Sequence, residues 1–108
     1  MKLIKIIPSD LKTKKYTAYF ELDNKKERKI NFGASGYRDY TLLNDKSSKF
    51  YEKDKVDREK IKDAYLARHE KNEDWNDTLT AGALSRWILW DLPTLGGSIN
   101  KFKRKFKL

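Results

Sequence analysis

The feature that most constrains this chain is its C-terminal third, residues 78–108, in which an apolar, aromatic stretch runs directly into a basic one. The first part, TLTAGALSRWILW, has Arg86 as its single charged residue and is suited to burial. The second part, INKFKRKFKL, is suited to contact with something acidic. Asp91 is the only acidic residue of this third, against six basic ones. The pattern therefore predicts a protein that works through a binding surface, not through a reaction.

Length and composition bound the organisation of the chain. A chain of 108 residues has room for one modest hydrophobic core and not for two, so residues 1–108 are interpreted as a single domain. Charged residues make up 38% of the chain, so the core must rely on three Trp, six Tyr and five Phe. Cysteine is absent, which excludes disulfides and thiol nucleophiles and favours an intracellular or intravirion setting. The N-terminal apolar run is interrupted by Lys5 and is too short for a signal peptide or a membrane span, so no membrane partner is expected.

Residues 1–45 have the pattern of short strands. The segments KLIKII (residues 2–7), YTAYFEL (16–22) and RKINF (28–32) are rich in β-branched and aromatic residues. Polar loops separate them, and Asp23 and Asn24 begin a turn between the second and the third. The simplest arrangement is an antiparallel meander. The following stretch FGASGYRDYTLL is interpreted as a tight turn that leads into another extended piece.

Residues 46–108 have the pattern of helices. Apolar residues recur at helical spacing over about residues 53–71, with alternating charges between them. A second helix is expected after a cap at Thr78 or Thr80 and must end at Pro93. Thr94 is the expected cap of a last helix with an apolar stripe of Leu95, Ile99, Phe102 and Phe106. The sequence therefore predicts an α+β fold, with a small antiparallel N-terminal sheet followed by about three helices packed on it.

Three segments carry a resemblance to a known family. The chain contains GxxGYxDYT at residues 33–41, RHxxxEDW at 68–75 and TAGALSRWILW at 80–90. These segments resemble those of a family of small uncharacterised proteins encoded by large DNA viruses of algae and amoebae. The resemblance implies a viral source and a location in the infected cell or the virion, and it implies no particular activity. Leu43 stands where the family pattern has a His, which weakens any metal or acid–base scheme that needs two histidines.

His69 and the acidic residues around it are the nearest approach to a metal or catalytic cluster. A His and a carboxylate four residues apart share a helix face, as His69 and Glu73 do. However, His69 is the only His and the chain has no Cys, so neither a metal site nor a cofactor nor a catalytic residue is predicted. The preferred interpretation is a helix end at which Arg68 and His69 complement the helix dipole. A hydrolase built on Arg68, His69 and Glu73, with Asp39 and Asp45 binding magnesium, is the enzymatic alternative.

Arg86 lies within an otherwise apolar helix and must find a carboxylate if it is buried. Asp74, Asp77 and Asp39 are the expected candidates. The structural interpretation is that Arg86 fixes its helix to the preceding loop, and the functional one is a phosphate contact. Arg68, His69 and Trp75 are likewise interpreted either as structural residues or as phosphate contacts.

The basic residues carry the strongest functional signal, because nucleic-acid affinity depends mainly on Lys and Arg neutralising phosphates. The expected contacts are Lys101, Lys103, Arg104, Lys105, Lys107, Lys12, Lys14, Lys15, Lys25, Lys26, Arg28 and Lys29. The leading hypothesis is a small protein that binds DNA or RNA without sequence specificity, in genome packaging or organisation. The alternative is a virion or host-interaction adaptor that binds another protein. The first hypothesis needs the basic residues to converge on one face, and the second needs an exposed apolar patch.

Overall fold

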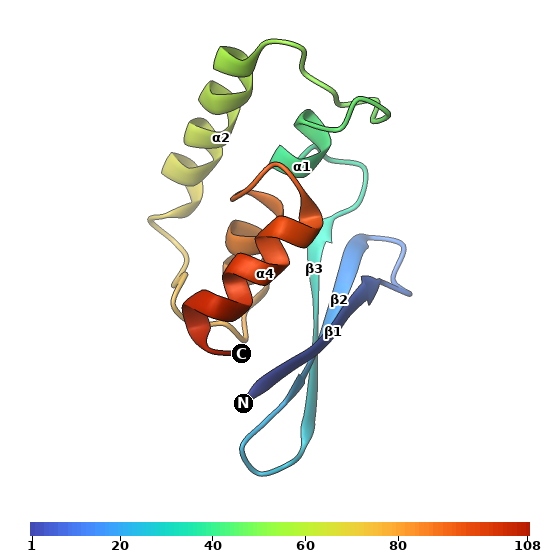
Figure 1. The fold of residues 1–108 in the computed structure, drawn as a ribbon, viewed down its shortest axis with the longest axis vertical. Coiled ribbons are helices and arrows are strands. Elements are labelled where there is room, and N and C mark those ends of the chain that lie inside the picture. The colour runs from blue at the N-terminus through green and yellow to red at the C-terminus, as the bar shows by residue number, and fades with distance from the viewer.

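A computed structural model describes all residues 1–108 and has the expected α+β architecture (Figure 1). The N-terminal part is a three-stranded antiparallel sheet in the order β1-β2-β3. Its strands are β1 (Lys2–Pro8), β2 (Lys14–Glu21) and β3 (Glu27–Ala34). The register of β2 against β3 runs from Lys14 opposite Ala34 to Glu21 opposite Glu27. The meander that the β-branched and aromatic segments predicted is therefore confirmed.

The helical part begins earlier than the sequence indicated. The helices are α1 (Tyr40–Leu43), α2 (Lys55–His69), α3 (Ala81–Leu84), the π-helix η1 (Ser85–Leu89) and α4 (Leu95–Phe106). The extended piece expected after Gly36 is wrong, because α1 occupies this place. Asp39 is its N-cap, and the carboxylate accepts a hydrogen bond from the Leu42 amide at 3.1 Å.

Two threonines cap the helices of the C-terminal third as expected. The Thr80 hydroxyl accepts a hydrogen bond from the Ala83 amide, and the Thr94 hydroxyl accepts one from the Gly97 amide. The helix expected from Thr80 to Pro93 is one continuous segment that changes from α3 to η1 at Ser85. In η1 the Trp90 amide bonds the Ser85 carbonyl, five residues back, which widens the turn.

The core lies between one face of the sheet and the C-terminal helices. The sheet contributes Leu3, Ala18, Phe20 and Phe32, and the helices contribute Leu84, Ile88, Leu89 and Phe102, all of them buried. The apolar stripe of α4 therefore faces the core as predicted. In contrast, α2 has no buried residue and only packs partly buried side chains against this core. Figure 1 shows α2 displaced to one side of the molecule, away from the sheet.

Candidate functional site

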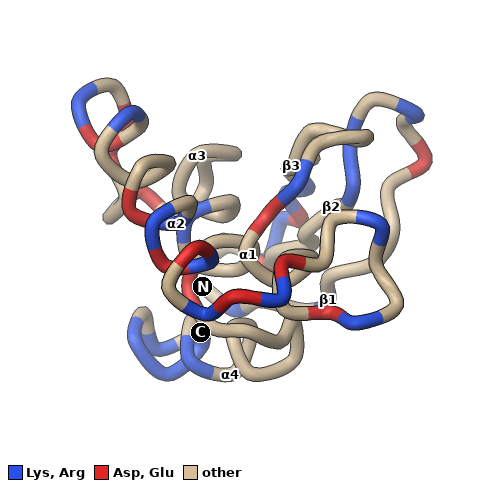
Figure 2. Tube along the Cα trace, turned by 90° about the horizontal axis from the view of Figure 1, so that it is seen from above, with Lys and Arg blue, Asp and Glu red and all other residues tan.

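Eight of the twelve predicted phosphate contacts are exposed and lie on two elements, and we call this set the basic end. The group consists of Lys25, Lys26, Arg28, Lys29, Lys103, Arg104, Lys105 and Lys107, all exposed. The residues lie on the β2–β3 hairpin and at the end of α4, in the lower half of Figure 1. Figure 2 shows no acidic residue among the basic ones at the end of α4. Only Lys25 of the group has a carboxylate within ion-pair distance, that of Glu21 at 3.8 Å.

The cations of α4 also stabilise the helix that carries them. Lys103, Arg104 and Lys105 lie in the last turn, where positive charge complements the negative end of the helix dipole. The Lys105 Nζ lies 4.6 Å from the centroid of the Trp87 ring, within the range of a cation–π contact. These side chains therefore have a structural role beside any role in binding.

The other four predicted contacts lie elsewhere. Lys12 is exposed on the β1–β2 loop, and Lys14 and Lys15 follow at the start of β2. The Lys15 Nζ lies 2.7 Å from Asp39 Oδ2 and also donates to the Tyr37 carbonyl. Lys101 is paired with Asp91 at 3.0 Å. Lys15 and Lys101 thus have internal carboxylate partners and do not belong to the basic end.

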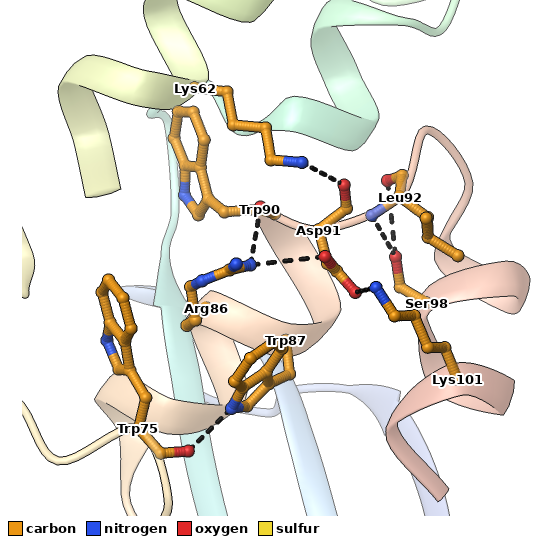
Figure 3. A network of polar contacts seen from close by, with 9 residues as sticks. All are labelled: Lys62, Trp75, Arg86, Trp87, Trp90, Asp91, Leu92, Ser98 and Lys101. Atoms are coloured by element: carbon orange, nitrogen blue, oxygen red, sulfur yellow. Dashed lines mark hydrogen bonds and ion pairs between the residues drawn. The ribbon is translucent and has the colours of Figure 1, made fainter. Parts of the chain in front are cut away.

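Asp91 is the centre of a buried polar network that joins three helices (Figure 3). Its side chain is 7% exposed and accepts from Arg86 Nη1 at 3.4 Å and pairs with Lys101 of α4. Its backbone carbonyl accepts from Lys62 Nζ of α2 at 2.7 Å. The network therefore holds α2, η1 and α4 together around one residue, Asp91, through its carboxylate and its backbone carbonyl.

The expected carboxylate partners of Arg86 are wrong, because Asp91 takes this role. Arg86 Nη1 also donates to the Trp90 carbonyl at 3.2 Å, while its Nε is buried without a hydrogen-bond partner. Asp91 follows Arg86 by five residues and is the only acidic residue in residues 78–108. That isolated acidic residue is the sequence signal that could have identified the pair.

The tryptophans near Arg86 are part of the structure of this region. The Arg86 guanidinium lies 4.3 Å from the ring centroid of Trp87 and 5.3 Å from that of Trp75. The Trp87 Nε1 donates to the Trp75 carbonyl at 2.7 Å. Both indoles are partly buried. The contacts fix the loop before α3 to η1, as the structural interpretation of Arg86 and Trp75 proposed.

A pocket of about 420 Å³ lies where the three segments singled out in the sequence meet. The segment at 33–41 contributes Tyr37, Arg38 and Asp39, and the second segment contributes Arg68, His69 and Glu73. The third segment contributes Ala81, Gly82, Ser85, Leu89 and Trp90, and β2 contributes Lys14 and Lys15. The hydrolase alternative grouped Arg68, His69 and Glu73 with Asp39, and all four line the pocket. The spacing along the chain does not show that Tyr37, Arg38 and the third segment join them.

Both carboxylates of the pocket are hydrogen-bonded within the protein. Besides Lys15 and the Leu42 amide, Asp39 accepts a hydrogen bond from the Thr41 hydroxyl. Glu73 Oε2 lies 3.1 Å from His69 Nδ1, and Glu73 Oε1 accepts from the Trp75 Nε1 at 3.0 Å.

Gly82 explains how Glu73 fits against α3. A Cβ at residue 82 would lie 2.8 Å from the Glu73 Cδ, so only glycine lets this carboxylate approach.

The arrangement gives no support to a magnesium-dependent hydrolase built on Asp39 and Asp45. The Asp45 carboxylate accepts from the amide and the hydroxyl of Ser47, in a turn outside the pocket. No three His, Asp or Glu side chains gather closely enough to hold a metal ion. None of the helices has the length and apolar character needed to cross a membrane.

Three rings form a column in the wall of the pocket. The Tyr65 ring lies 4.1 Å from that of His69 and 4.0 Å from that of Trp90, and it is nearly parallel to both. Two rings cannot occupy one face at that distance, so Tyr65 is sandwiched between the other two. Burial, and to a smaller extent the charge of Glu73, raise the pKa of Tyr65 from 10.0 to about 12.

The raised pKa of Tyr65 makes stability sensitive to alkaline pH. In the unfolded chain the phenol ionises near its ordinary pKa, whereas the folded state keeps it neutral to about 12. The stabilisation is therefore complete below about pH 10 and is lost as pH rises from there towards 12. Urea denaturation should show the free energy of unfolding falling over this interval, with a smaller fall in Tyr65→Phe. An equal fall in both proteins would contradict the assignment to Tyr65.

Comparison with known proteins gives one similarity. The sequence model of a family of unknown function, DUF5754, matches residues 4–54, slightly less than half of the chain. The matched part contains nearly all of the sheet and α1, and it includes the first of the three segments that meet at the pocket. No curated protein and no solved structure is similar to the chain. The similarity is to a family with no described activity and assigns no chemistry to the site.

Proposed function

We propose that the protein binds nucleic acid through phosphate contacts made by the basic end, without sequence specificity. The observation that carries the proposal is that eight exposed Lys and Arg side chains lie on two elements and that seven of them have no carboxylate partner. Cations that are not neutralised within the protein are free to replace the counterions of a phosphate backbone. No helix-turn-helix or zinc-binding pattern accompanies them, so the expected contacts are to the backbone and not to the bases. A role in packaging or organising a genome would suit such binding.

The first test measures affinity as a function of salt. Fluorescence anisotropy with duplex DNA, single-stranded DNA and RNA of equal length should show binding that weakens steeply with salt. On duplex DNA each phosphate contact contributes a slope of about −0.9 in log K against log salt. For the triple variant K103Q/R104Q/K105Q, the slope of log K against log salt should therefore be shallower by about 2 to 3. The variant should also bind duplex DNA roughly tenfold or more weakly at low salt.

A matched control separates the basic end from net charge. The variant K46Q/K53Q/K60Q removes the same charge from exposed positions in the balanced middle of the chain. It should keep most of the affinity and nearly all of the slope. Equal losses in the two triple variants would discard the basic end as the binding surface.

The alternative function, an adaptor that binds another protein, is favoured by a different observation. Met1, Ile4, Ile7 and Leu11 are exposed large apolar side chains, and all lie on β1 or on the residues flanking it. In the sheet β1 is an edge strand, so its outer hydrogen-bonding edge could pair with an extended segment of a partner. Absence of nucleic-acid binding even at low salt would favour this function.

A further inference from the structure

The pocket formed by the three convergent segments has an excess of positive charge that the protein does not neutralise. Its two carboxylates are already hydrogen-bonded, Asp39 to Lys15 and Glu73 to His69 and Trp75. The remaining charged side chains at its wall are Lys14, Arg38 and Arg68, and none of these takes part in an ion pair. Arg38 and Arg68 are exposed, so their guanidinium groups are available to a ligand. A planar guanidinium matches the geometry of a phosphate group and binds it through two hydrogen bonds.

The inner part of the same pocket is apolar and aromatic. Tyr65, Leu89 and Trp90 line this part, and the Glu73 side chain occupies the space beside Gly82. The Ser85 hydroxyl lines the pocket and makes no hydrogen bond within the protein. Ser85 and Leu89 are the first and last residues of η1, and π-helical turns are frequent at functional sites. A bare phosphate would leave this apolar wall unfilled, so the pocket suits a ligand with a planar organic part as well as an anionic one.

Tyr37 supplies a further surface for a ring at the rim of the pocket. Its side chain lines the pocket and is 70% exposed, the most exposed of the large apolar side chains. It has no aromatic or cation–π partner in the structure. A free aromatic ring beside an arginine is the arrangement on which nucleic-acid bases stack.

We infer that this pocket binds a nucleotide, with the phosphate at Arg68, Arg38 and Lys14 and the base on the free ring of Tyr37 at the rim. The volume of about 420 Å³ is within the range of small-ligand sites. Two kinds of ligand present a base and a phosphate in this way, a free mononucleotide and the phosphorylated end of a nucleic-acid strand. The inference does not depend on the basic end, because the two sites share no residue.

Isothermal titration calorimetry with AMP tests the inference. AMP should bind with a Kd of roughly 10 μM to 1 mM, while adenosine and inorganic phosphate each bind about tenfold or more weakly, because each contacts half of the site. The variant R68Q should weaken AMP binding about tenfold, since a charge-assisted hydrogen bond is lost. K71Q, two residues beyond α2 and outside the pocket, is the matched control and should bind AMP as the unchanged protein does.

Further measurements distinguish a free nucleotide from a strand end, and binding at the pocket from binding at the basic end. A single-stranded DNA with a 5′-phosphate that displaces AMP better than its 5′-hydroxyl counterpart would identify a strand end, and equal displacement would identify the free nucleotide. K103Q/R104Q/K105Q should retain AMP binding even where it loses duplex DNA. The inference is overturned by absence of heat with AMP at millimolar concentration, or by equal losses in R68Q and K71Q. Circular dichroism of each variant ensures that a loss of binding is not a loss of fold.

Discussion

Asp91→Ala should lose about 3–5 kcal/mol of folding free energy, the cost of leaving a buried charge without its partner. The variant would deprive Arg86 and Lys101 of their only carboxylate, and the Arg86 side chain is 14% exposed. The Nε of Arg86 already lacks a partner, so the Trp90 carbonyl would be the only hydrogen-bond acceptor left to the guanidinium. Urea denaturation followed by circular dichroism measures the loss, which corresponds to a fall in Tm of more than about 10 °C for a domain of this size.

The control for Asp91 is an exposed carboxylate on α2. Asp63 makes no ion pair, and Asp63→Ala should change the free energy of unfolding by no more than about 0.5 kcal/mol. A loss below about 1 kcal/mol in Asp91→Ala would show that the network is not needed for stability. Replacing both charges, in R86M with D91L, should recover part of the loss, because a well-packed apolar pair can substitute for a buried ion pair.

Asp39→Ala is expected to have an effect of similar size at the other buried carboxylate. Asp39 is 2% exposed, pairs with Lys15 and caps α1 through the Leu42 amide. Removing it would leave Lys15 beside the Tyr37 carbonyl alone and would uncap the helix, for a combined loss of about 3–5 kcal/mol. The same denaturation measurement applies.

The control for Asp39→Ala is Asp45→Ala. The hydrolase hypothesis treats Asp39 and Asp45 as equal magnesium ligands, whereas the structure places Asp45 in an exposed turn with Ser47. Asp45→Ala should therefore cost less than about 1 kcal/mol. Similar stability losses in the two variants would contradict the structural role assigned to Asp39.

Much of the fold could be predicted from the sequence because its signals are local. The strands of the meander are rich in β-branched and aromatic residues, and α2 has a long helical period. The error at α1 has a physical cause. Its residues Tyr40 and Thr41 have high strand propensity, and four residues are too few to show a helical period, so the capping carboxylate of Asp39 determined the outcome.

The candidate site could be predicted only in part. The sequence identified Arg68, His69 and the basic residues of α4, but it could not show which cations are neutralised within the protein. Lys15 reaches Asp39 across 24 positions of the chain, and Lys101 reaches Asp91 from another helix. Such pairs depend on how the elements pack, and no periodicity along the chain encodes them. The π-helical turn at Ser85 was missed for a related reason, since its apolar spacing is the same as that of an α-helix.

Substitutions at the lysines of α4 should differ in their effect on stability, because only one of these lysines has a carboxylate partner. Lys101 is bound to the buried Asp91, while Lys103, Arg104 and Lys105 are exposed. Neighbouring cations of one helix therefore differ in what they contact, since Lys101 pairs with a buried carboxylate and the exposed cations pair with none. Loss of charge at Lys103 or Lys105 would remove surface charge and a favourable contact with the helix end, but no buried ion pair. Loss of the charge at Lys101 would instead release the helix from its carboxylate anchor.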